Sequence, residues 1–438
     1  MKNWLTIFRL GLVQAAIGAM VMLSTSLLNR VMVVELKLAA AIPAGLVAWH
    51  YAVQLSRPVS GHASDRSGRR TPWILTGMGL LALGSLLAVN AVILLHGGSW
   101  AAFAALLLAF TLIGLGVGTA GTALLALLAA SVPAERRAAA AATTWIMMVA
   151  GIAIAAGVAG KLLTPFSLDR LGLVAGSIVL VAFSLSLIGV AGLERGTQPT
   201  NGERARTPFL AALREVRRDR EAVRFTLFVF LSMLAYSMQD LILEPFAGLV
   251  FGASPGESTS LSGIQHGGIL VGMLLSGCLA GPWLRRGGPP LIWWTIAGCA
   301  GSAAALAGLA LAARAGPPWP LTANIFLLGL MNGVFAASAI AAMMELAGRD
   351  GSDKAGVRMG VWGAAQAIAF GTGGLTGALA TDAARALLGA DGPAFALTFG
   401  AEALLFLLAA HFALRLPDRK AHPGPMGDYR WSASTSLS

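Results

Sequence analysis

The chain has 438 residues, of which 56% are hydrophobic and only 12% are charged, and its mean hydropathy is +0.74. A soluble domain carries about twice that charged fraction, so the composition excludes an ordinary soluble protein and indicates a polytopic helical membrane protein. The net charge of +11 would favour nucleic-acid binding in a soluble protein, but here it fits the excess of Lys and Arg in loops on one side of a membrane.

Apolar runs of about 20 residues predict twelve membrane spans. In chain order they cover 10–34, 43–63, 72–95, 100–128, 139–163, 171–193, 225–251, 261–284, 291–313, 321–346, 357–380 and 394–416. The second run is apolar only to residue 55 and continues as a more polar turn. The fold class expected is therefore all-α, with twelve transmembrane helices.

The runs divide the chain into four parts. These are an N-terminal six-helix half at 1–193, a basic linker at 194–224, a C-terminal six-helix half at 225–416 and a tail at 417–438. The linker contains an amphipathic helical pattern that predicts a helix on the membrane surface, and the polar tail is predicted to be disordered. Of the 31 Lys and Arg residues, 25 fall on the side that carries both termini and the linker. This asymmetry predicts that both termini are cytoplasmic.

The loop after the second span carries four charged residues within ten. The residues that define its sequence pattern are Gly61, Asp65, Arg66, Gly68, Arg69 and Arg70. The loop after the eighth span repeats the spacing from Gly281 to Gly288, with Arg in place of the Asp, which indicates two parallel repeats. The pattern closely resembles the conformational signature of the major facilitator superfamily. That resemblance implies 6+6 parallel pseudo-repeats and a contact between Asp65 and the start of the eleventh span.

Polar side chains inside the first and seventh spans are the main functional signal, because a charge at the centre of a bilayer costs about 2.5–3.5 kcal/mol. The residues are Asn29, Arg30 and Glu35 in the first span and Gln239, Asp240 and Glu244 in the seventh. We expect Arg30 to pair with Asp240 or Glu244. Such a pair could have a purely structural role and hold one face of the protein closed, or it could contact a ligand or a partner protein. Glu402 is expected near a span end or in a local pair.

Four segments carry a narrower resemblance. They are 29–36, 57–66, 239–246 and 363–371. Together they resemble the PucC/LhaA family, the bacteriochlorophyll delivery branch of the major facilitator superfamily. The resemblance implies a light-harvesting complex assembly factor that binds (bacterio)chlorophyll or a precursor as cargo and delivers it to antenna apoproteins. It also implies a bacterial inner, intracytoplasmic photosynthetic membrane, with light-harvesting polypeptides and pigment-synthesis enzymes as partners and no nucleic acid.

A bound chlorophyll requires one axial ligand to its magnesium and a flat apolar slot. His266 and Glu244 are the leading candidates for the ligand, and His50, Glu35, Gln239 and Gln366 are further ones. The alternative for His266 is a hydrogen-bonded interior histidine. No metal or redox cofactor of the protein itself is expected.

Enzyme signatures are absent from the sequence: there is no phosphate-binding Gly-Lys-Ser/Thr loop and no nucleophile elbow. We therefore expect a non-enzyme. A secondary transporter of a small solute remains the alternative function. The fourth span contains no Arg and the fifth contains no Gly-Pro element, so the residues typical of drug/proton exchange are missing.

Overall fold

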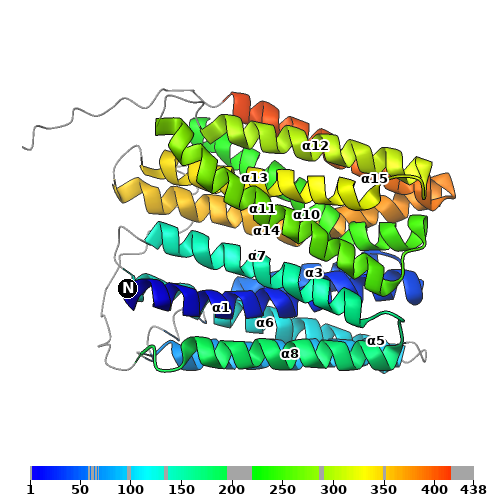
Figure 1. The fold of residues 1–438 in the computed structure, drawn as a ribbon, viewed down its shortest axis with the longest axis horizontal. Coiled ribbons are helices and arrows are strands. Elements are labelled where there is room, and N and C mark those ends of the chain that lie inside the picture. The colour runs from blue at the N-terminus through cyan, green and yellow to red at the C-terminus, as the bar shows by residue number, and fades with distance from the viewer. Residues whose placement is uncertain are drawn as a thin grey trace, which may run out of the picture.

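The structure is a computed structural model that describes residues 2–57, 60, 64, 67, 69–95, 100–132, 137–194, 220–285, 291–348 and 352–415. These residues form twelve helices of 13 or more residues, which lie side by side along the long axis of the bundle (Figure 1). The first six are α1 (Lys2–Met22), α3 (Ala41–Val53), α5 (Thr71–Leu95), α6 (Trp100–Ser131), α7 (Arg137–Leu162) and α8 (Leu168–Val190). The second six are α10 (Arg220–Phe251), α11 (Pro255–Arg285), α12 (Leu291–Ala315), α13 (Leu321–Gly348), α14 (Ser352–Leu388) and α15 (Asp391–Leu414).

Ten helical segments within the described ranges are long and apolar enough to cross a membrane, which confirms a polytopic helical membrane protein. Helices α3 and α14 complete the set of twelve. Most helices begin and end within a few residues of the predicted spans, because a run of apolar side chains decides where a membrane helix lies. The largest difference is α14, which is longer at both ends than the predicted span at 357–380.

The first span departs from a regular α-helix. After α1 it forms a π-helical turn at Leu23–Leu27, a short α-helical piece, α2 (Leu28–Arg30), and a second π-helical turn at Val31–Glu35. Two hydroxyls within the first turn compete for a backbone acceptor, since Ser24 and Thr25 both donate to the carbonyl of Val21 at 2.9 and 3.1 Å. Such competition with backbone hydrogen bonding distorts helices, and π-helical turns are frequent at functional sites.

Two apolar cores lie in the bundle, one mainly among α1–α8 and one among α10–α15. The halves meet where α7 packs on α11, where α3 packs on α14, and where the π-helical part of the first span packs on α10. Helix α1 begins and α15 ends at one end of the bundle, on the left of Figure 1. We call this the terminal end, and the opposite end the far end.

Candidate functional site

A buried carboxylate joins the two halves near the far end. Glu244 on α10 is 3% exposed, and its carboxylate accepts hydrogen bonds from the hydroxyl of Ser26 and, at 3.3 Å, from that of Thr259. The hydroxyl of Ser26 also lies 3.0 Å from that of Ser262 on α11. The first π-helical turn thus places a hydroxyl of the N-terminal half on a carboxylate of the C-terminal half.

Arg30 also reaches the other half, but not through the predicted ion pair. Its guanidinium forms an ion pair with Glu35 and donates to the carbonyl of Ala253 at 2.6 Å. The predicted salt bridge to Asp240 or Glu244 is not formed, although Arg30 is close enough to Glu244 to interact with it electrostatically. The physical reason is local: the second π-helical turn brings Glu35 against Arg30, while hydroxyl groups already occupy the carboxylate of Glu244.

Three more hydrogen bonds join the halves at this end. The amide of Asn29 donates to the carbonyl of Leu241 at 2.7 Å. The carboxylate of Asp382 accepts the backbone N–H groups of Ala40 and Ala41 at 3.2 and 2.8 Å, at the start of α3. A carboxylate is favourable there because a helix N-terminus carries partial positive charge. Asp382 is not predictable as a site residue, since nothing in the sequence shows that the two helix ends meet.

Aromatic side chains lie between the halves deeper in the bundle. Phe370 on α14 lies between Tyr51 on α3 and Tyr236 on α10, with ring centroids 6.3 and 5.8 Å away. Asp240, one turn from Tyr236, is close enough to interact electrostatically with both tyrosines. The chain contains three tyrosines in total, so this cluster holds two of them. No pattern in the sequence indicates that two of them meet.

His266 lies beside an apolar surface at the same interface. Its Nδ1 is 2.9 Å from the carbonyl of Ser262, which fixes the ring and leaves Nε2 as the atom able to bind a ligand. One and two turns further along α11, Ile269 and Met273 pack with Val149 of α7. A histidine next to apolar side chains is the combination that an axially bound chlorophyll needs.

The other predicted ligands lie in different surroundings. Both ring nitrogens of His50 have neighbours, the carbonyl of Val47 at 3.0 Å and the amide nitrogen of Gln54 at 2.9 Å, so neither is free for a metal. Gln366 is partly buried, with its amide 3.8 Å from the sulfur of Met233. Gln239 is fully buried in the core of the C-terminal half rather than at the interface.

The signature loop is described only in part, because Gly61, Asp65, Arg66 and Gly68 lie outside the described residues. At its end, Glu194 accepts the backbone N–H groups of Arg70 at 2.7 Å and Thr71 at 2.9 Å, and Arg70 also donates to the carbonyl of Ala126 at 2.9 Å. A carboxylate at the start of the predicted linker therefore holds the start of α5. Arg69 lies just before that helix.

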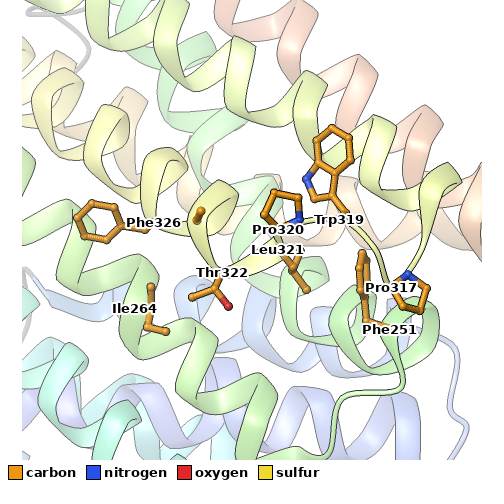
Figure 2. Close-up of a pocket in the computed structure, with 9 residues that line it drawn as sticks. Phe251, Ile264, Pro317, Trp319, Pro320, Leu321, Thr322 and Phe326 are labelled. Atoms are coloured by element: carbon orange, nitrogen blue, oxygen red, sulfur yellow. The ribbon is translucent and has the colours of Figure 1, made fainter.

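An open groove of about 710 Å³ lies elsewhere, at the far end of the C-terminal half. Figure 2 shows its lining by Phe251 and Ile264 together with residues around the turn between α12 and α13, among them Trp319. None of the predicted site residues lines it. The candidate site is therefore the interface between the halves and not this groove.

Comparison with known proteins identifies the family. A family model described as "PUCC protein" matches residues 27–421. The chain belongs to the PUCC protein family. It is 49% identical, over 94% of its length and 95% of the relative's, to the "Bacteriochlorophyll synthase 44.5 kDa chain" of Rhodobacter capsulatus. It is 29% identical, over 83% and 81% of the two chains, to "Protein PucC" of Cereibacter sphaeroides.

The fold also has solved counterparts. A crystal structure of the peptide transporter POT in complex with sulfate superposes with a TM-score of 0.67 over 94% of both chains at 15% identity. At that identity the likeness concerns the fold alone, and it confirms the predicted major facilitator fold for this member of the PUCC family.

Proposed function

We propose that this chain is a light-harvesting complex assembly factor that binds (bacterio)chlorophyll, or a precursor, and delivers it to antenna apoproteins. The family match supports this proposal, as do relatives from purple bacteria whose names refer to PucC and to bacteriochlorophyll synthase. The proposed setting is the inner photosynthetic membrane, with both termini in the cytoplasm. The asymmetry of Lys and Arg residues supports that orientation.

One observation supports a particular location for the pigment site. His266 presents Nε2 next to the apolar cluster of Val149, Ile269 and Met273, where the two halves meet. In the proposed complex, His266 binds the magnesium of the pigment and the apolar side chains contact the macrocycle. Glu244 is the weaker candidate ligand, because its carboxylate already accepts hydroxyl groups from both halves.

We propose a delivery role rather than catalysis. The name of the Rhodobacter capsulatus relative refers to a chain of a synthase, so a place next to pigment-synthesis enzymes agrees with delivery. The proposed partners are those enzymes and the light-harvesting polypeptides that receive the pigment.

The test is purification in mild detergent from a pigment-producing host, followed by an absorption spectrum. We expect stoichiometric (bacterio)chlorophyll or precursor in the wild type and its loss in His266→Ala, because the axial ligand is removed. His411→Ala is the matched control, since this histidine is exposed near the terminal end of α15, and it should keep the pigment. A colourless wild-type protein from such a host contradicts the proposal.

The fold favours a second candidate, a secondary transporter of a small solute, because solved structures of a peptide transporter share it. Solute-driven proton uptake in vesicles, by protein that carries no pigment, would establish that function in place of delivery.

A further inference from the structure

Two polar side chains interrupt the apolar contact between α10 and α15. On α10, Ala235, Gln239 and Ile242 lie on the same helix face as Phe246, whose ring contacts α15. The facing stripe on α15 consists of Phe395, Phe399, Glu402 and Phe406. Both stripes follow the spacing i, i+4, i+7, i+11 of one helix face. All eight side chains are at most 1% exposed, so the amide and the carboxyl group lie wholly in the core.

The register of the two helices indicates that these polar groups lie at about the same level along the bundle. Helices α10 and α15 are antiparallel, and the ring of Phe246 lies 5.3 Å from that of Phe395 and 5.0 Å from that of Phe399. Seven residues toward the terminal end along each helix, about 10 Å away, lie Gln239 and Glu402. Both carboxylate oxygens of Glu402 and both polar atoms of the Gln239 side chain have no hydrogen-bond partner among the described residues.

A third helix adds an amide at the same level. The ring of Phe335 on α13 lies 5.9 Å from that of Phe406, and one turn toward the far end from these rings lie Asn332 and Glu402. Asn332 is fully buried; its carbonyl accepts the hydroxyl of Ser302 on α12 at 2.9 Å, while its amide nitrogen has no described partner. The core of the C-terminal half thus contains a carboxyl group and two amides whose hydrogen-bonding capacity the described residues do not fill.

The charge of Glu402 cannot be balanced by a neighbouring side chain. Among the described residues, Asp240 is the charged group that interacts electrostatically with Glu402, and it carries the same sign. The remaining ionisable groups on the described parts of α10, α12 and α14 include Tyr236 and Glu244 on α10, the thiol of Cys299 on α12 and, toward helix ends, Arg314, Asp382 and Arg385. An unpaired carboxylate in an apolar core is strongly unfavourable, whereas a carboxylic acid can both donate to and accept from an amide.

We propose that Glu402 is a proton-binding site in the core of the C-terminal half. Its carboxyl group holds the proton, and we assign the amide oxygen of Gln239, which accepts no hydrogen bond from the described residues, as the acceptor for the carboxyl O–H. Asp240, next to Gln239 and partly exposed at the interface between the halves, is the group through which the proton is exchanged. A metal cation needs several oxygen ligands, whereas a proton needs one acceptor oxygen. The few oxygen atoms at Glu402 therefore favour a bound proton over a bound metal cation. The proposal does not depend on pigment binding.

Infrared spectroscopy of the purified full-length protein, at a pH above the ordinary carboxyl pKa of about 4, tests this site. The wild-type-minus-Glu402→Gln difference spectrum should show the carbonyl stretch of a protonated carboxylic acid. Glu257→Gln is the matched control, because Glu257 is a solvent-exposed carboxylate at the start of α11, and this variant should remove only an ionised carboxylate band. Loss of an ionised band in Glu402→Gln overturns the proposal.

Two further measurements complete the test. Replacing choline chloride with sodium chloride should leave the acid band unchanged, and its conversion into a carboxylate band would overturn the proton site in favour of a sodium site. Gln239→Leu should move the acid band to higher frequency, because the carboxyl O–H loses its acceptor. This variant keeps Glu402 in place, so an unshifted band would contradict the pairing even if Glu402→Gln failed to fold.

Discussion

Ser24 and Ser26 lie two residues apart but have different roles. One forms a hydrogen bond within its own helix, and the other forms a hydrogen bond between the halves. Both side chains are buried in the first span. Ser24 donates to the carbonyl of Val21 in its own helix, whereas Ser26 donates to the carboxylate of Glu244 in the other half. A hydrogen bond to a charged group contributes more than a neutral one, and Ser26 makes it across the interface.

We predict that Ser26→Ala lowers the free energy of unfolding by about 1–3 kcal/mol, because Glu244 loses a charge-assisted hydrogen bond. Ser24→Ala is the matched control and should have a smaller effect, since it removes a hydrogen bond within one helix. Thermal unfolding in mild detergent measures both. Equal melting temperatures for the two variants would contradict the role assigned to Ser26.

At the level of helices, α7 and α11 approach each other through small residues. A Cβ atom added to Gly160 would lie 2.6 Å from the carbonyl oxygen of Gly256, which is too close for any side chain. A Cβ atom at Gly157, one turn away on α7, would meet nothing within 4 Å. Small residues at such contacts allow two membrane helices to pack closely. The close packing of α7 on α11 at the far end therefore depends on Gly160 more than on Gly157.

Gly160→Ala should push α7 away from α11 and destabilise the far end by about 1–3 kcal/mol, the range expected for overpacking. Gly157→Ala should be tolerated. Hydrogen exchange at residues 252–254, between α10 and α11, is the measurement, because Arg30 donates to the carbonyl of Ala253 in that segment. Faster exchange in Gly160→Ala alone is expected, and similar exchange in both variants would be evidence against this contact.

Across the whole molecule, the described hydrogen bonds between the halves lie toward the far end. They involve Ser26, Asn29, Arg30, Ala40 and Ala41 of the N-terminal half and reach α10, α11, α14 and the segment between α10 and α11. Deeper in the bundle the described contacts between the halves are aromatic and apolar. The far end is thus closed by directional bonds.

Spin labels can measure this closure. With Cys278 and Cys299 replaced by Ser, labels at Lys37→Cys and Leu388→Cys report the distance between the halves at the far end, where both side chains are exposed. We expect one narrow distance distribution, and a broader one after Asp382→Ala removes the acceptor for the start of α3. An unchanged distribution in Asp382→Ala would show that this carboxylate does not hold the halves together.

The sequence allowed prediction of the helices, because apolar runs decide where spans lie, and it indicated the importance of Glu244, since a carboxylate within a span requires partners. It did not reveal those partners. Arg30 pairs with Glu35 because a π-helical turn lies between them, and no residue pattern predicted that turn. Glu402 was expected near a span end or in a local pair, and this was wrong: it lies near the middle of α15, fully buried, without a described partner. Which face of an apolar helix becomes the core depends on its neighbours.

The π-helical turns of the first span also affect how the chain tolerates a change in length. Each turn closes hydrogen bonds five residues apart instead of four, so it accommodates a residue that a regular helix would not. Deleting one residue within Leu23–Leu27 would leave a regular α-helix with little rotation of the side chains on either side. The same deletion in the regular part of α1 would rotate the side chains on one side of it by about 100° relative to the other. Asn29 and Arg30 would therefore still face the second half after the first deletion but not after the second, although hydropathy and composition would hardly change in either.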